Sequence, residues 1–363
     1  MKSTMKYDIV KIDFPFTSNS NSGKGVDRYC YMLSEGLKSF GVNYFNVEGN
    51  SSTSYFSSHY KSFPWKMKEV RSLNGKIFHA TTPFAWMVPY LTFKNNILTT
   101  IHDIVPFFSV RNQFKVKESI SRNILILQII GSLYGSDIII TPFNFTKEWL
   151  QNHFNIDNSK IEVVSYGIDL PIKTNNLLNS KQGLSFKHNF LFLGSLNPID
   201  RGVIYALNAF KLFSINIEEE YLVISMKFGT QQYMETVKII KSLGLGNRIK
   251  IIDFVPENNL MDFLSKFRAL LYPSRIGFSL LLMQSLAAGT PVIASNTFDI
   301  PDFLRDSGIH PIKLDYNAFY EEMMKLFLDS YLYDRIEKGF NHIKKFSSET
   351  MCKRTIEIYN KLL

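Results

Sequence analysis

The segment from Leu271 to Ser295 constrains the fold of this chain more than any other part of the sequence. It contains an apolar run, a break at Pro273, a turn of small residues, a helix-periodic apolar stretch and a second short apolar run. Gly289 precedes Pro291 after the periodic stretch, which is the order that normally ends a helix. The segment therefore predicts a buried strand, a turn, a helix and another buried strand, as in a βαβ unit.

The turn inside this segment, Gly277-Phe278-Ser279, directly precedes the predicted helix. Backbone N–H groups at a helix N-terminus have no intrahelical partner, and they favour a nearby anion. Taken alone, the turn has two interpretations. It is either an ordinary βαβ corner, which is the commoner case, or a site for a phosphate group.

Length and composition indicate a globular protein of two domains. The chain has 363 residues, of which 45% are hydrophobic and 20% charged. The net charge of +9 favours anionic partners such as nucleotide phosphates, acidic lipid head groups or nucleic acid. No module that interleaves basic and aromatic residues supports nucleic acid, so we exclude that partner. The two cysteines, Cys30 and Cys352, argue against a disulfide framework and favour a reducing compartment.

No stretch of the sequence has the pattern of a secretory signal or a membrane-spanning helix, and we expect no metal site. These features predict a cytoplasmic protein. The segment from Arg111 to Ile130 is basic and then apolar, which favours peripheral contact with the anionic inner face of a membrane. A core helix with a charged amino-terminal half is an equally good interpretation of the same segment.

Candidate site residues follow three predicted strands in the first half of the chain. Gly23 and Gly25 lie in the loop between a first strand and a helix, where backbone approaches a phosphate or sugar closely, although such loops are often simple turns. His79 and His102 each end a short apolar run, and ligands of open α/β sheets bind at the carboxyl ends of strands. The Ser- and Asn-rich stretch from Asn50 to Tyr60 has no period, which predicts a loop.

The segment PSRIGFSLLLMQSLAAGTPVI resembles the donor-site signature of the family 4 retaining glycosyltransferases, group 1. The positions in register are Pro273, Ser274, Gly277, Phe278, Leu280, Gly289, Pro291, Val292 and Ile293. Ile276 and Gln284 occupy the places of the family's paired glutamates. Ser279 replaces the signature's second glycine, and Leu281 replaces its proline. The glycine, proline and apolar positions of the signature are present, whereas its two carboxylates are absent.

Three further segments resemble the same family. TTIHDIVPF resembles a motif whose histidine faces the donor sugar, which implies a catalytic role for His102. GSLNPIDRGVIYALNAF resembles the motif whose basic residue holds the donor diphosphate, which implies this role for Arg201, with Ser195 at a second basic position. A longer match ends in SYGID, where Ser165-Tyr166 replaces the usual proline-asparagine.

The resemblance implies a GT-B fold, in which two Rossmann-like domains face each other across a cleft. The implied divisions are an acceptor-side domain over residues 1–173, a nucleotide-sugar domain over 188–344, and a final helix over 345–363 that packs back on the first domain. The implied donor is a UDP- or GDP-sugar, with no bound cofactor or metal, and the implied acceptor is a glycan or a lipid-linked acceptor. Donor-binding residues would be Gly23, Gly25, Ser195, Arg201, Gly277, Phe278, Ser279, Leu280 and Gln284.

The replaced glutamates leave two functional classes open. In one, the protein is an active transferase that retains the anomeric configuration, because the remaining groups suffice for a less polar donor sugar. In the other, it is a catalytically silent relative that acts as a binding or scaffold partner. Gln284 still accepts hydrogen bonds from a ribose through its neutral carbonyl, whereas Ile276 makes none.

Overall fold

The computed structural model describes residues 6–13, 25–48, 57–85, 87–104, 107, 116–170, 188–193, 202–274, 280–296 and 312–363. The chain divides into two compact units. Unit 1 comprises Met1–Gly167 and Ser348–Leu363, and unit 2 comprises Ile168–Ser347. Each unit contains one parallel sheet covered by helices, which confirms the predicted α/β class. The residues between the first two predicted divisions, 174–187, lie outside the described residues.

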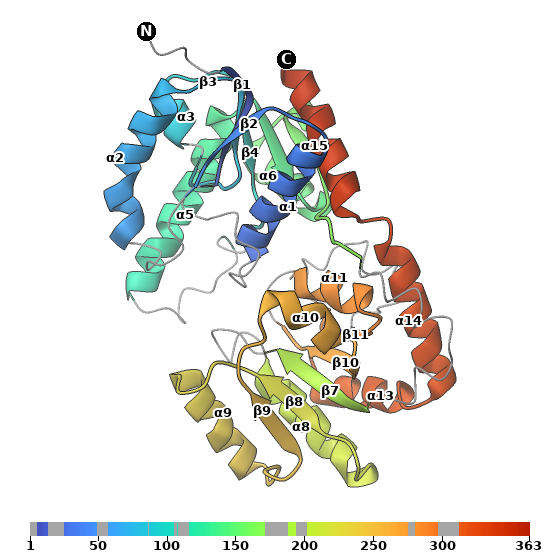
Figure 1. Cartoon of the computed structure of the whole chain (residues 1–363). Helices are drawn as coiled ribbons and strands as arrows, with labels where there is room; N and C mark the ends of the chain where they lie inside the picture. Colours follow the sequence, from blue (N-terminus) through green and yellow to red (C-terminus); the bar gives the residue numbers. More distant parts are fainter. Residues whose placement is uncertain are drawn as a thin grey trace. The chain divides into compact units, whose positions relative to one another are not determined.

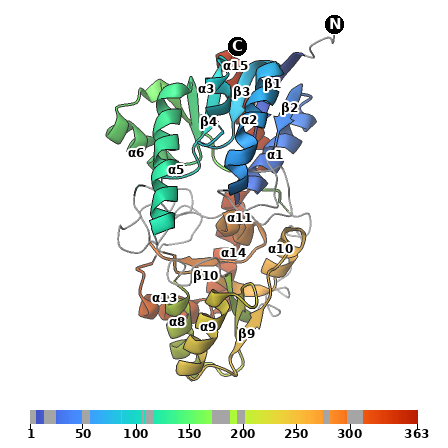
Figure 2. The same cartoon turned by 90° about the vertical axis from the view of Figure 1, so that its left-hand side faces the viewer.

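Unit 1 is built on a six-stranded parallel sheet with the order β2-β1-β3-β4-β5-β6. The strands are β1 (Lys6–Ile12), β2 (Tyr44–Val47), β3 (Asn74–Ala80), β4 (Ile97–Thr100), β5 (Ile138–Thr141) and β6 (Ile161–Val163). The helices are α1 (Gly25–Ser39), α2 (Ser57–Ser72), α3 (Met87–Leu91), α5 (Val116–Gly135), α6 (Asn144–Phe154), the short 3₁₀ helix η1 (Asn158–Lys160) and α15 (Ser348–Leu362). Figures 1 and 2 show α2, α3 and α5 on one face of this sheet, with α1 and α15 on the other.

Alternation along β1 and β3 places Lys11 and His79 on the face opposite to Val10 and Phe78. Val10 and Phe78 pack in an apolar cluster with Val70 of α2. The intervening side chains, including Lys11 and His79, project to the face that α1 and α15 cover. This second face therefore contains a buried polar layer at the carboxyl ends of the two strands.

Unit 2 is built on a five-stranded parallel sheet with the order β11-β10-β7-β8-β9. The strands are β7 (His188–Leu193), β8 (Leu222–Ser225), β9 (Ile249–Ile252), β10 (Phe267–Tyr272) and β11 (Val292–Ala294). The helices are α8 (Val203–Asn216), α9 (Gln231–Ser242), α10 (Glu257–Leu264), α11 (Leu280–Ala287), α13 (Tyr316–Lys325) and α14 (Asp329–Ile343). The strand, helix and strand predicted around Leu282 are β10, α11 and β11, in that order.

The strand orders fix where a ligand can enter each unit. The order of unit 1 reverses between β1 and β3, and that of unit 2 between β7 and β10. In open α/β sheets, ligands bind outside the carboxyl ends of the strands at such a reversal. The two reversal points are therefore the places to look for a site.

One local prediction is wrong, because α2 begins at Ser57 inside the stretch predicted as a loop. The helix contains Pro64 and has a weak apolar pattern, so its sequence alone does not favour a helix strongly. Its buried residue Val70 packs on β1 and β3, and this tertiary packing stabilises the helix.

Candidate functional site

His102 follows β4 in unit 1, and both of its ring nitrogens are hydrogen-bonded. Nε2 lies 2.8 Å from the carbonyl oxygen of Thr81, and Nδ1 lies 2.8 Å from the hydroxyl of Tyr166. A carbonyl only accepts, so Nε2 carries the proton and Nδ1 accepts from Tyr166. The imidazole is thus held in one neutral tautomer.

Partial burial keeps this imidazole neutral. Loss of hydration lowers the pKa of His102 to about 4, against a smaller opposing effect of the Thr81 carbonyl. The ring also stacks on Tyr166, with an interplanar angle of 13°, and meets the edge of Tyr29 at a centroid distance of 5.0 Å. A neutral ring with both nitrogens engaged is suited to positioning a neighbour rather than to transferring a proton.

His79 lies in the polar layer of the same unit and is completely buried. Its Nδ1 lies 2.7 Å from the hydroxyl of Tyr359 on α15, and its Nε2 lies 2.9 Å from Thr100 Oγ1 on β4. Thr100 Oγ1 in turn lies 3.1 Å from the hydroxyl of Tyr29 on α1. Burial, reinforced by repulsion from Lys11, lowers the pKa of His79 to about 3. His79 therefore joins two strands to the helices that cover them.

A buried ion pair completes the polar layer. Lys11 and Asp13 are both fully buried and paired with each other, and the Lys11 ammonium also donates to the carbonyl of Cys30 at 3.3 Å. Asp13 accepts from Thr81 Oγ1 at 3.0 Å, and the carbonyl of Thr81 is the one that holds His102. The ion pair and the candidate catalytic histidine thus share one threonine at the reversal between β1 and β3.

In unit 2, the reversal between β7 and β10 contains an unusually close backbone contact. Gly202 has a φ of +64°, and a Cβ atom at this position would lie 1.8 Å from the carbonyl oxygen of Pro273. No other residue fits there without displacing backbone. Gly202 immediately follows Arg201 and directly precedes α8, while Pro273 directly follows β10. The contact therefore brings the start of α8 against the residue that follows β10.

Gln284 lies on α11 and is 7% exposed. Its Nε2 donates to Oε1 of Glu257 at 2.5 Å. Glu257 is the first residue of α10 and is half-buried. A carboxylate from a neighbouring helix thus contacts the side chain at position 284, where the sequence resemblance predicts a glutamate.

The predicted site residues fall into three groups. His102 and Gly25, the exposed first residue of α1, belong to unit 1, while Leu280 and Gln284 belong to α11 of unit 2. The others, together with Ile276, lie outside the described residues and stay predictions: Gly23, Ser195, Arg201, Gly277, Phe278 and Ser279.

Sequence reasoning missed three contacting residues. Thr81 carried no signal of its own. Tyr166 was visible as a departure from the usual asparagine, and Glu257 as an acidic residue directly after Pro256 at a helix start.

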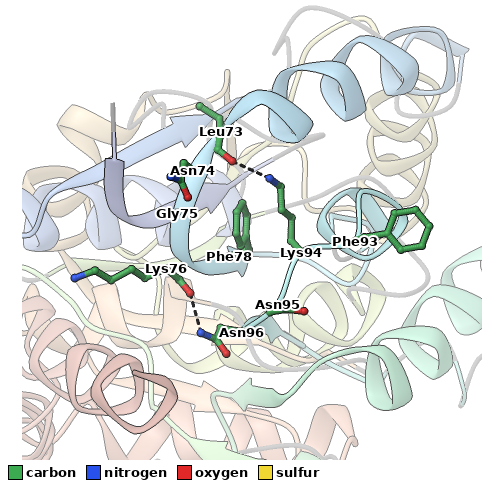
Figure 3. A pocket seen from close by; sticks show the side chains of 9 residues that line it. All are labelled: Leu73, Asn74, Gly75, Lys76, Phe78, Phe93, Lys94, Asn95 and Asn96. Atoms are coloured by element: carbon green, nitrogen blue, oxygen red, sulfur yellow. Dashed lines mark hydrogen bonds between the residues drawn. The ribbon is translucent and has the colours of Figure 1, made fainter. Parts of the chain in front are cut away.

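A cavity of about 280 Å³ lies at the other end of the unit 1 sheet, near the amino end of β3 (Figure 3). Its lining residues are Leu73, Asn74, Gly75, Lys76, Phe78, Phe93, Lys94, Asn95 and Asn96. Lys94 Nζ donates to the carbonyls of Leu73, at 2.8 Å, and Arg71, at 3.2 Å. Asn96 Nδ2 donates to the carbonyl of Lys76 at 2.9 Å. These side chains bind backbone carbonyl groups at the end of α2 and the start of β3. We therefore assign the cavity a structural role.

Two kinds of feature are absent from the described residues. None of the helices within those ranges is long and apolar enough to cross a membrane. In the same part of the chain, His, Cys, Asp and Glu side chains form no group of three that could hold a metal ion.

Two family models match most of the chain. The model described as "Glycosyltransferase Family 4" matches residues 23–171, and the one described as "Glycosyl transferases group 1" matches residues 187–329. The first match lies mainly in unit 1 and the second lies entirely in unit 2.

Individual proteins agree with these matches. O-antigen chain mannosyltransferase B of Escherichia coli is 22% identical over 276 residues, which cover 73% of this chain and 70% of the relative. Sucrose-phosphate synthase from Thermosynechococcus elongatus has a TM-score of 0.74 at 15% identity, covering 98% of this chain and 99% of that one. Alr3699/HepE of Anabaena, in complex with UDP-glucose, has a TM-score of 0.69 at 12% identity, covering 98% of this chain and all 100% of that one. The two structures share the GT-B fold with this chain.

Proposed function

The chain belongs to family 4 of the glycosyltransferases, group 1, and on that premise we propose that it moves a hexose from a UDP- or GDP-sugar to a glycan or lipid-linked acceptor with retention of configuration. In this reaction the bond between the anomeric carbon and the diphosphate oxygen breaks. The acceptor hydroxyl oxygen bonds to the same carbon, and its proton leaves with the nucleoside diphosphate. Unit 2 binds the donor, and unit 1 binds the acceptor.

The observation that carries this proposal is the contact between Gly202 and Pro273 at the reversal point of unit 2. It supports placing Arg201 beside the donor diphosphate, where a guanidinium binds two phosphate oxygens at once. The backbone amides of Phe278 and Ser279 would add N–H groups as negative charge builds on the leaving diphosphate. No metal ion is needed in this scheme, because these groups meet the diphosphate charge.

The alternative, a silent scaffold, rests on the loss of both glutamates at Ile276 and Gln284. The contact between Gln284 and Glu257 counts against it, since a carboxylate is still present beside one of the two positions. His102 is also held in a defined tautomer beside the reversal point of unit 1. We therefore prefer an active enzyme whose donor sugar is less polar where Ile276 would touch it, such as a deoxysugar.

The experiment is a donor panel in which nucleoside diphosphate release is measured with and without a crude lipid acceptor. We expect release that depends on the acceptor with at least one UDP- or GDP-sugar. The double variant I276E/Q284E should be slower than the wild type with that donor. Wild-type protein that binds no nucleotide sugar across the panel would contradict the enzyme proposal and leave the scaffold.

We also propose that the protein works in the cytoplasm at an anionic membrane surface. Of the predicted segment, residues 111–115 lie outside the described residues. Helix α5 exposes Leu127 within the segment and Tyr134 just after it, which are 67% and 63% exposed. Helix α2 exposes Trp65 and, one turn later, Lys68. Exposed apolar and basic side chains suit an interfacial contact. Flotation with anionic vesicles tests this proposal: binding at low salt supports it, and no binding at low salt contradicts it.

A further inference from the structure

His102 has two hydrogen-bond partners, and only one of them fixes which ring nitrogen carries the proton. The hydroxyl of Tyr166, 2.8 Å from Nδ1, is able to donate or to accept, so it suits either neutral tautomer. The carbonyl of Thr81, 2.8 Å from Nε2, only accepts, so it requires a proton on Nε2. The position of this carbonyl therefore determines the tautomer and the orientation of the imidazole ring.

The carbonyl belongs to a residue that is anchored through both its backbone and its side chain. Thr81 directly follows β3 and is completely buried. Its backbone N–H donates to the carbonyl of Ile12, at the end of β1, at 3.1 Å. Its hydroxyl oxygen lies 3.1 Å from the same carbonyl and 3.0 Å from Asp13 Oδ1. Thr81 is thus held on β1 while its carbonyl binds His102.

The groups around the Thr81 hydroxyl favour its bond to Asp13. The Cys30 thiol lies 3.4 Å from Thr81 Oγ1, and burial raises the pKa of this thiol well above its ordinary value. The thiol therefore keeps its proton and donates it to Oγ1, and the hydroxyl proton points to an acceptor. Of the two acceptors in reach, a carboxylate is stronger than a carbonyl. Lys11 pairs with the other oxygen of Asp13 and also donates to the Cys30 carbonyl at 3.3 Å, which holds the carboxylate in place.

We propose that Thr81 is a positioning residue for His102, and that the ion pair of Lys11 and Asp13 acts through it. The pair orients the Thr81 hydroxyl, the anchored threonine presents its carbonyl, and this carbonyl selects the Nε2–H tautomer of the ring. The inference rests on the proposed function, because it takes His102 to act in sugar transfer. It gives the buried ion pair a role besides stability, since an apolar pair of similar volume often stabilises a buried position as well or better.

The first test compares T81V and T81S with the wild type by NMR of the His102 ring nitrogens. T81V keeps the volume of the side chain but removes the hydroxyl, whereas T81S keeps the hydroxyl. We expect a slowly exchanging Nε2–H proton in the wild type and in T81S. In T81V this proton should exchange with water about tenfold faster, because a hydrogen bond to a charged group no longer fixes its acceptor. Equal exchange rates in all three proteins would overturn the inference.

The second test is the kinetics of transfer, with the donor and acceptor that the donor panel identifies. A misplaced group slows the chemical step more than it weakens binding, so T81V should lower kcat about tenfold and change the donor KM by less than about twofold. T81S should recover most of kcat. A loss in T81V that appears in KM alone, or one that T81S does not recover, would contradict a positioning role.

The double variant K11M/D13L separates positioning from stability. An apolar pair replaces the ion pair, so the variant should keep most of the unfolding free energy of the wild type. Thr81 nevertheless loses its carboxylate partner, so we expect the fast Nε2–H exchange and the low kcat of T81V. A stable K11M/D13L protein that matches the wild type in both measurements would limit the ion pair to stability and overturn its proposed action through Thr81.

The matched control is T99V on β4. Thr99 is also completely buried in unit 1, and its Oγ1 lies 2.7 Å from Ser136 Oγ, so T99V removes a buried threonine hydroxyl of the same kind. It should leave the His102 exchange rate and kcat unchanged. If the wild type transfers no sugar but T81V speeds the exchange, the proposed function fails, and the part of this inference that concerns transfer fails with it. If the wild type is active and T81V exchanges like T81S, only the inference fails.

Discussion

The candidate sites of units 1 and 2 hold their polar side chains in opposite ways. In unit 1 the polar groups project from the strands themselves, and Lys11 and His79 are fully buried, each with polar partners inside the unit. In unit 2 the polar pair projects from two helices, α10 and α11, and one member is half-buried. The strands of unit 2 instead contribute mainly apolar side chains to one large core.

The two units therefore contribute to a site in different ways. Buried polar groups whose partners lie within the same unit hold strand ends and the neighbouring histidine in place, but they exchange no proton with a ligand at neutral pH. A helix-borne polar pair is less costly to expose to solvent than a polar group on a buried strand. We infer that unit 1 contributes shape and unit 2 contributes binding charge. Three predictions address this comparison.

The largest expected effect is on the stability of unit 1. K11M removes the ammonium beside a buried carboxylate, and breaking a buried ion pair from one side costs about 3–5 kcal/mol of unfolding free energy. Hydrogen exchange should show much weaker protection in β1 and β3, with β7 and β8 unchanged. The double variant K11M/D13L should recover most of the loss, because an apolar pair replaces the ion pair.

The control for K11M is K250M, on β9 of unit 2. Lys250 Nζ lies 3.9 Å from the ring centroid of Tyr221 at an exposed position, a cation–π contact worth about 0.5–1 kcal/mol. Equal losses of stability in K11M and K250M would contradict the contrast between the two units.

The second prediction concerns the pH dependence of stability. The pKa of His79 falls to about 3 in the folded protein, below its ordinary value of 6.5. Between these values the unfolded state binds more protons, so stability falls as pH falls through this window. From pH 7 to pH 5 this group removes about 2 kcal/mol of unfolding free energy, at about 1.4 kcal/mol per pH unit below 6.5. H79Q should lose that part of the pH dependence.

The measurement is urea unfolding of wild type and H79Q at pH 7 and pH 5, followed by hydrogen exchange so that unit 1 is observed separately. The control is H153Q, at an exposed position on α6. H79Q is expected to be less stable at both pH values, because Tyr359 and Thr100 lose a partner. A drop between pH 7 and pH 5 that is as large in H79Q as in the wild type would show that His79 does not carry the effect.

Much of the fold could be predicted from the sequence because it depends on local patterns. The strand, helix and strand around Leu282 follow from apolar runs, a glycine and a proline, and both histidines lie at strand ends as predicted. The start of α2 could not be predicted, since its stability comes from packing of Val70 on distant strands. Lys11 also gave no signal, because a lysine in a strand is normally expected to face solvent.

The contacts of the site were less predictable than its positions. Tyr166 and His102 are 64 residues apart, and Gln284 and Glu257 are 27 apart. Which side chains meet across such separations depends on how whole elements pack, which periodicity does not reveal. The sequence identified Gln284 as a departure, but the carboxylate that contacts it became evident only from the packing of α10 against α11.

The smallest expected effect comes from Tyr166, whose hydroxyl donates to Nδ1 of His102. Y166F removes this donor, and one neutral hydrogen bond contributes about 1 kcal/mol, or roughly fivefold in kcat/KM. The donated hydrogen bond favours the neutral imidazole, so its loss should raise the pKa of His102 from about 4 towards its ordinary value. An NMR titration of the His102 ring nitrogens measures this shift without any substrate.

The control is Y134F, since Tyr134 donates to the carbonyl of Phe154 at an exposed position of α5. If Y166F leaves the His102 titration unchanged while activity falls, Tyr166 acts through its packing alone. If the titration shifts and the acidic side of the activity profile moves with it, Tyr166 is the positioning residue that keeps this histidine neutral.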